Sequence, residues 1–122
     1  MIIEDSDITE ALPPRERASS KFDYGRVAVI GGTRGMRGAP SMAAHAAIAL
    51  GAGLVDLLAP SIHPLTPREI ITHEVPYHAD GTISVDSFEA IHQVLSKATV
   101  IVIGPGMAFL IARLYEKRFS IC

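Results

Sequence analysis

The sequence predicts an α/β protein built on a parallel sheet, and three features support this fold class. Two short apolar runs, 27–30 and 54–59, are typical of strands that are buried on both faces. An alanine-rich segment lies between them and favours a helix. A strand, a helix and a second strand within about 33 residues form the βαβ unit of parallel sheets.

The first strand, 27–30, is followed by Gly31-Gly32, where the chain must turn. The helix is expected over 40–50. Pro40 suits its first position, where no N–H donor is needed, and six alanines lie between residues 39 and 49. Gly51 and Gly53 are expected to end this helix, and Pro60 to close the second strand, 54–59.

Further elements follow the βαβ unit. Residues 70–75 read as a third, shorter strand, and 78–81 as a turn. A helix is expected over 86–97 because its apolar residues have helical spacing: Phe88, Ile91, Val94 and Leu95. Residues 99–103 read as a strand buried on both faces, like the first. A more diffuse apolar pattern predicts a helix over 108–119, and Met36 and Met42 are expected to pack.

The length of 122 residues leaves room for one domain, since domains most often have about 100–150 residues. Residues 1–23 are polar, contain Pro13-Pro14 and read as a lead-in or linker. The domain proper is expected over 24–107, with a separate tail over 108–122.

Composition argues against several function classes. The net charge of −2 offers no basic field for nucleic acid. No apolar run reaches the roughly 20 residues that span a bilayer, so no membrane partner is expected. The acidic start lacks the features of a signal peptide, and the single cysteine, Cys122, fits a reducing compartment. We therefore expect a cytoplasmic protein.

Histidine and serine motifs are uninformative. The five histidines show no metal-ligand spacing, so no metal site is expected on them: His45, His63, His73, His78 and His92. His45, on the alanine-rich helix, is expected to be a packed or a surface residue. No serine stands in the GxSxG context of a hydrolase nucleophile.

The glycine-rich turn after the first strand is a candidate ligand site, because ligands of open α/β sheets bind at the carboxyl ends of strands. Its glycines, Gly31, Gly32, Gly35 and Gly38, fit neither the dinucleotide fingerprint nor a Walker A loop. The turn either binds a ligand or only lets the helix pack closely. Arginines at 34 and 37 favour an anionic ligand, or are simply solvated.

A second glycine turn, Gly104-Pro105-Gly106, follows the strand at 99–103. The carboxyl ends of parallel strands meet at one edge of a sheet, so the two turns are expected to converge on one crevice.

Five segments, in this order along the chain, resemble one known family: 12–15 (LPPR), 21–25 (KFDYG), 29–39 (VIGGTRGMRGA), 51–55 (GAGLV) and 104–107 (GPGM). They resemble the NAD(P)H-hydrate dehydratases, the carbohydrate-kinase-like branch of the ribokinase-like fold. The resemblance implies a three-layer α/β/α sandwich, of which 24–107 would be the N-terminal part.

The resemblance also implies a repair activity, the dehydration of (6S)-NADHX and NADPHX to NADH and NADPH. Such enzymes use ADP, or ATP in eukaryotic relatives, together with Mg²⁺, and tend to form homo-oligomers. Carried over from the family, Ala39 and Gly106 would lie against the hydrated nicotinamide nucleotide. Gly38 and Gly104, in the same two turns, are expected to belong to the same substrate-binding site.

Several departures limit the implied activity. The family's Gly-x-Gly-Asp motif with its catalytic aspartate is absent, so no catalytic residue is expected in this chain. Ala108 stands where the family usually has glycine, and 108–122 shows no resemblance. We therefore expect an apparently truncated domain, with a tail from a frameshift or an early stop, that is inactive alone.

An incomplete sheet would expose an apolar edge and lower solubility. Two other functional hypotheses remain open. One is a non-catalytic α/β nucleotide-binding module, and the other is a fragment of another ribokinase-like kinase.

Overall fold

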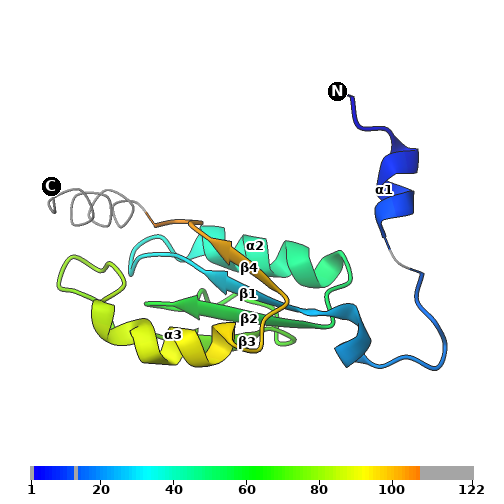
Figure 1. Cartoon of the computed structure of the whole chain (residues 1–122). Coiled ribbons are helices and arrows are strands. Elements are labelled where there is room, and N and C mark those ends of the chain that lie inside the picture. Colours follow the sequence, from blue (N-terminus) through cyan, green and yellow to red (C-terminus); the bar gives the residue numbers. More distant parts are fainter. Residues whose placement is uncertain (1, 13, 108–122) are drawn as a thin grey trace, which may run out of the picture.

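The computed structural model describes residues 2–12 and 14–107, and its centre is a four-stranded parallel sheet (Figure 1). The strands are β1 (Arg26–Ile30), β2 (Leu54–Ala59), β3 (Ile71–Glu74) and β4 (Val100–Ile103). Their order across the sheet is β3-β2-β1-β4, and every pairing is parallel. All four strands were predicted within one residue of these bounds.

Helix α2 (Gly38–Ala49) covers one face of the sheet. Val29, Val55 and Leu57 point to this face and are buried against the helix. The small side chain of Ala44 lets the helix approach the strands closely, and Ala44 is therefore fully buried. Gly51, with φ of 106°, ends the helix as predicted.

Helix α3 (Phe88–Leu95), which follows the short 3₁₀ turn η2 (Val85–Ser87), covers the other face. Ala28, Ile30 and Leu58 point to that face, opposite to their neighbours in each strand. Ile91, Val94 and Leu95 of α3 pack on them. Helix, sheet and helix make the three-layer α/β/α arrangement that was predicted.

Phe88 differs from the other apolar residues of α3. Its side chain is exposed and stacks on His92 at 6.0 Å between ring centroids. The helix begins at Phe88 rather than at 86, so this side chain lies at the end of the sheet-facing stripe.

The prediction that β4 is buried on both faces was wrong. Val100, Ile101 and Ile103 are 51%, 46% and 62% exposed, respectively, and only Val102 packs against the core. The reason is the strand order, because β4 forms an edge of the described sheet and pairs with β1 alone. Composition identifies a strand, but it does not identify a strand's place in the sheet.

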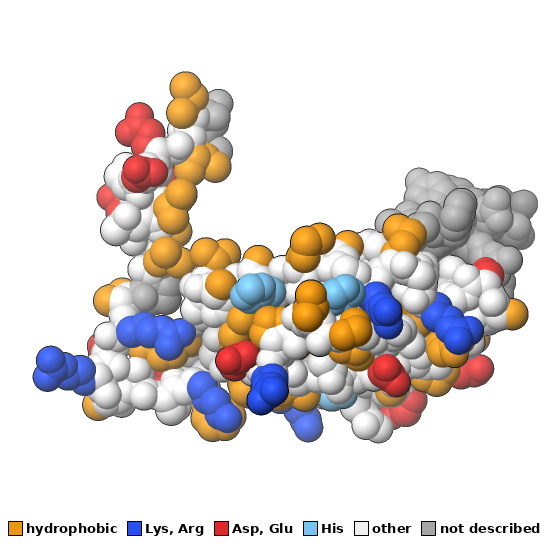
Figure 2. Space-filling model, turned by 180° about the vertical axis from the view of Figure 1, so that it is seen from behind, with side chains coloured by type: hydrophobic (Ala, Val, Ile, Leu, Met, Phe, Trp, Pro, Cys, Tyr) orange, Lys and Arg blue, Asp and Glu red, His pale blue; other side chains and the backbone are white. Residues whose placement is uncertain are grey.

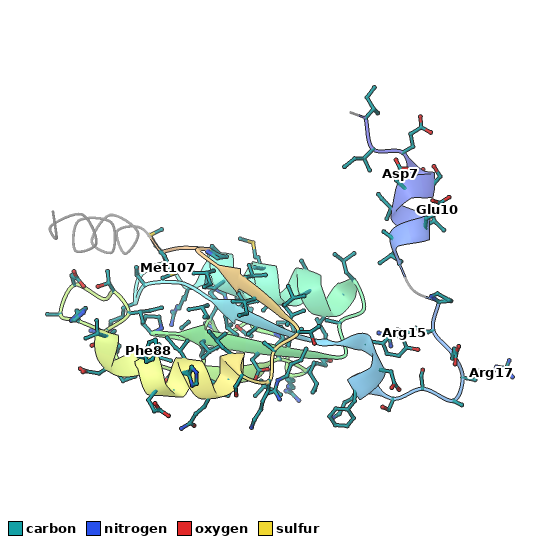
Figure 3. The ribbon with its side chains drawn as sticks, in the orientation of Figure 1. Asp7, Glu10, Arg15, Arg17, Phe88 and Met107 are labelled. Carbon is teal, nitrogen blue, oxygen red and sulfur yellow. The ribbon has the colours of Figure 1, made fainter. Side chains whose placement is uncertain are left out.

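The N-terminal segment contains a helix that was not predicted. α1 (Asp5–Ala11) has no buried residue and stands apart from the sheet, with Asp7 and Glu10 on it (Figure 3). A capping box between Glu4 and Asp7 starts this helix. The 3₁₀ turn η1 (Lys21–Tyr24) then leads into β1.

Two smaller predictions also need correction. α2 begins at Gly38, so Pro40 is its third residue and not its first. Proline still costs no hydrogen bond there, because the first four N–H groups of a helix have no intrahelical acceptor. Met36 and Met42 are 47% and 68% exposed, so they do not pack in the core. The helix predicted over 108–119 lies outside the described residues.

Candidate ligand-binding site

The two glycine turns meet at the carboxyl ends of β1 and β4. The N–H of Gly32 donates to the carbonyl oxygen of Pro105 at 2.7 Å, and the N–H of Gly104 donates to that of Ile30 at 3.2 Å. The N–H of Gly31 donates to Leu58 of the neighbouring strand β2 at 3.1 Å. The expected convergence of the two turns is therefore present.

This close approach requires glycine. Gly106 has φ of 70°, and a Cβ atom there would lie 2.6 Å from the carbonyl oxygen of Met36. The same Cβ atom would lie 3.4 Å from Cδ of Pro40, in the first turn of α2. Gly32 has φ of 83° and would place a Cβ 3.1 Å from Pro40. The turns are thus packed backbone against backbone, beside the start of α2.

Three backbone N–H groups at this edge remain without a hydrogen-bond acceptor among the described residues. Gly38 and Ala39 are the first two residues of α2, so their N–H groups have no intrahelical acceptor, and Gly106 makes no backbone hydrogen bond through its N–H. All three residues are half-buried. They are also three of the four residues that the sequence singled out as substrate-binding.

Gly104, the fourth, has a different position. It ends β4 with φ of 126°, its N–H is already used by Ile30, and a Cβ atom there would meet nothing within 4 Å. Its conformation directs the chain toward Pro105, so its part in the edge is to shape the turn.

The turn arginines lie at the rim of this edge. The N–H of Arg34 donates to the carbonyl oxygen of Gly81 at 2.9 Å, which docks the first glycine turn on the predicted turn at 78–81. The Arg34 guanidinium lies 5.7 Å from the centre of the Tyr77 ring. Arg34 and Arg37 are exposed, and within 2–12 and 14–107 neither forms an ion pair.

No group of three or more His, Cys, Asp or Glu side chains in the described segments could hold a metal ion. No described helix is long and apolar enough to cross a membrane.

A charged cluster that the sequence analysis missed lies away from the glycine turns. Asp56 of β2 is fully buried. Its carboxylate accepts two hydrogen bonds from Arg26, from Nε at 2.5 Å and from Nη2 at 2.8 Å, and lies 2.8 Å from Nε2 of His73. Arg26 is the first residue of β1, so the cluster lies toward the opposite end of the sheet from Gly31.

Burial alone would raise the pKa of Asp56, but hydrogen bonds and charges from Arg26 and His73 outweigh it and hold that pKa below its ordinary value. The pKa of Arg26 is raised, chiefly by its hydrogen bonds to Asp56. The one sequence signal for this cluster was a carboxylate inside an apolar strand. Such a group needs a partner, and the parallel pairing of β2 with β1 and β3 supplies two.

Comparison with known proteins decides the family. The family model described as NAD(P)H-hydrate dehydratase, a carbohydrate-kinase-like family, matches residues 27–109. The chain belongs to this dehydratase family. The match begins in β1 and includes both glycine turns, the features on which the resemblance was first based.

Individual proteins of the dehydratase family are also similar to this chain in sequence. The bifunctional NAD(P)H-hydrate repair enzyme of Moorella thermoacetica is 38% identical over 101 residues, which cover 80% of this chain and 19% of that enzyme. The ADP-dependent (S)-NAD(P)H-hydrate dehydratase of Listeria monocytogenes is 31% identical, over 79% of this chain and 33% of its own length.

The solved structure of a ribokinase-like superfamily protein from Enterococcus faecalis superposes with a TM-score of 0.71 at 29% identity. The superposition covers 95% of this chain and 39% of that one. The ribokinase-like fold is therefore confirmed. The chain spans between about a fifth and two fifths of the length of these three dehydratase-family and ribokinase-like proteins.

Proposed function

We propose that this chain supplies the substrate-binding edge of an ADP-dependent NAD(P)H-hydrate dehydratase. The ligand would be the hydrated dinucleotide, (6S)-NADHX or NADPHX, held where the two glycine turns meet. ADP would be the co-substrate, as the name of the Listeria dehydratase indicates for that enzyme. A homo-oligomeric assembly and a cytoplasmic location belong to the same proposal, and the single cysteine fits the reducing environment of the cytoplasm.

The observation that carries this proposal is the set of free donors at Gly38, Ala39 and Gly106. N–H groups at the start of a helix attract phosphate and carbonyl oxygens, and the positive end of the helix dipole strengthens that attraction. The absence of side-chain bulk at these positions lets a flat ring or a pyrophosphate approach the backbone. Arg34 and Arg37 lie close by in the sequence and add positive charge at the rim.

The reaction implied by the family transfers a phosphoryl group from ADP to the hydroxyl of the hydrated ring, which leaves AMP. Elimination then breaks the carbon–oxygen bond, releases phosphate, removes a proton from the adjacent carbon and restores the double bond of NADH or NADPH. Mg²⁺ would accompany the nucleotide phosphates. The described residues offer no cluster that fits a protein-held metal ion, so no step is assigned to one.

A chimeric enzyme tests the proposal. Residues 27–107 of this chain would replace the matching region of the Listeria dehydratase, and formation of NADPH from (S)-NADPHX with ADP would be followed at 340 nm. We expect the chimera to be active. Gly106→Val should lower its activity about a hundredfold by displacing the turn, whereas Gly35→Ala, where a Cβ meets nothing within 4 Å, should not.

Measuring the binding of (S)-NADPHX to the chain alone separates a dehydratase part from a non-catalytic nucleotide-binding module. If the chain binds (S)-NADPHX and the chimera is inactive although folded, the non-catalytic nucleotide-binding module becomes the better reading. If a folded chain shows no binding at all, the proposed substrate edge is wrong.

A further inference from the structure

A second feature of α2 carries an inference of its own. A pocket of about 240 Å³ lies between the first turns of α2 and the segment that follows β2. The helix contributes Gly38, Ser41, Met42 and His45, and the segment contributes His63, Leu65 and Pro67. Because Gly38 belongs to both, this pocket adjoins the candidate substrate edge.

The pocket wall is fixed by hydrogen bonds. The hydroxyls of Ser41 and Thr66 lie 2.8 Å apart and join the helix to the segment. Ser41 is only 6% exposed, so this bond is shielded from water. The N–H of Thr66 also donates to the carbonyl oxygen of His63 at 3.0 Å, which closes a turn in the segment. The pocket is therefore formed before any ligand arrives.

His63 has a defined hydrogen-bonding role. The N–H of Leu65 donates to Nδ1 of His63 at 3.1 Å, so Nδ1 carries no proton. In the neutral ring the proton must then be on Nε2, which becomes a donor. Such a ring is a poor ligand for a metal ion. Metal binding needs an unprotonated ring nitrogen, and the only one in this ring, Nδ1, already accepts the N–H of Leu65.

His45 complements His63. No hydrogen bond to its ring is found in the described part of the chain. A neutral imidazole has one donor and one acceptor nitrogen, so His45 can accept where His63 donates. Met42 and Leu65, which are 68% and 83% exposed, add apolar surface. Figure 2 shows histidine and hydrophobic side chains lying together on one face of the molecule.

We propose that this pocket binds a nitrogen ring of the dinucleotide, either the nicotinamide-derived ring or adenine, through an edge that places a hydrogen-bond acceptor next to an amino donor. The carboxamide of nicotinamide and the N1/N6 edge of adenine both have this arrangement. His63 would donate to the acceptor, His45 would accept from the amino group, and the Met42 thioether would contact the ring. The inference deepens the proposed function, on which it rests, because the pocket adjoins Gly38.

Titration of the full chain followed by NMR tests the proposal. Nicotinamide mononucleotide and AMP are the two ring sources, and ribose 5-phosphate is the ringless control. We expect the imidazole signals of His45 and His63 to shift with at least one of the two nucleotides, and those of His78 and His92 to stay. The nucleotide that binds more tightly identifies the ring. Equal shifts with ribose 5-phosphate, or no shift with either nucleotide, would overturn the proposal.

Variants then test the assigned contacts. His63→Asn keeps an acceptor for the N–H of Leu65, but its shorter side chain places no donor where Nε2 lies, and it should weaken nucleotide binding about five- to tenfold. Met42→Ser should also weaken binding, while His92→Asn on α3 should leave it unchanged. Unchanged binding in folded His63→Asn and Met42→Ser would contradict the assignment.

The same spectra separate this proposal from the proposed function. Backbone amides of Gly38, Ala39 and Gly106 report on the glycine edge when (S)-NADPHX is added. If those amides respond and the two histidines do not respond to any nucleotide, the pocket assignment fails and the substrate edge stands. If neither group responds to (S)-NADPHX or to the mononucleotides, both proposals fail.

Discussion

Arg26 holds the buried carboxylate of Asp56 through two hydrogen bonds, one from Nε at 2.5 Å and one from Nη2 at 2.8 Å. The pair links β1 to β2 on the α3 face of the sheet, and His73 adds a link to β3. One side chain therefore connects three adjacent strands. Because Asp56 is fully buried, losing any of these bonds leaves polar atoms that water cannot reach easily.

Asp56→Asn should lower the free energy of unfolding by about 2–3 kcal/mol, because an amide cannot accept from all the donors that face the carboxylate. Urea unfolding followed by circular dichroism measures this change. Asp5→Asn, at an exposed position of α1, is the matched control and should change stability by less than about 0.5 kcal/mol. Equal effects of the two substitutions would contradict the structural role of the cluster.

The same carboxylate predicts a pH dependence. The pKa of Asp56 is lower in the folded chain than its ordinary value of about 3.9, so its contribution to stability is complete above that pH and is lost as pH falls through the folded pKa. The stability difference between the unsubstituted chain and Asp56→Asn should therefore shrink below about pH 4. A difference that stays constant down to pH 2 would show that the charge of Asp56 is not involved.

Gly31→Ala should destabilise the chain by about 1–3 kcal/mol, because its Cβ would collide with the carbonyl oxygen of Pro105. Gly31 does not have a positive φ, so the effect isolates the steric contact between the two turns. Gly35→Ala, in the same turn, meets nothing within 4 Å and should be nearly neutral. Thermal unfolding of the two variants side by side gives the comparison.

Ala44→Leu tests the close approach of α2 to the sheet. Ala44 is fully buried, so a larger side chain must push the helix away, at a cost of about 1–3 kcal/mol. Ala46→Leu places the same side chain on an exposed position of the same helix and should have little effect. If denaturant midpoints fall equally for both, the effect comes from the helix itself and not from its packing.

The exposed edge at β4 predicts self-association. Unpaired backbone groups and apolar side chains on an edge strand favour pairing with another chain. Sedimentation velocity should show concentration-dependent association, and Ile103→Lys should reduce it. Ile3→Lys changes an equally exposed isoleucine outside the sheet and should not. A compact monomer at all concentrations would contradict this prediction.

Much of the fold was predictable because local patterns determine local structure. The apolar runs of β1 and β2 and the alanines of α2 each identify an element without reference to the rest of the chain. The meeting of the two glycine turns was also predictable, since parallel strands carry their carboxyl ends to one edge. The free N–H donors of Gly38, Ala39 and Gly106 were not predicted, because they depend on the start of α2 at Gly38 and on the conformation of the second glycine turn.

What could not be predicted depends on strand order and on weak local signals. The sequence VIVI at β4 is as apolar as a central strand, and its exposure follows only from its edge position. The partners of Asp56 come from residues 30 positions before it and 17 after it, which the parallel register brings together. α1 has no buried residue, and its sequence therefore lacks the apolar periodicity that identifies a helix packed on a core.

The pairing of β1 with β4 has a consequence for how the chain folds. Arg26 and Thr99, which join these strands at their start, are 73 residues apart, so a long loop must close before they meet. Closing it costs more chain entropy than the pairings of β1 with β2 and of β2 with β3. We therefore expect the ligand edge to be completed late in folding, and a bound ligand should slow amide hydrogen exchange in β4 more than in β2.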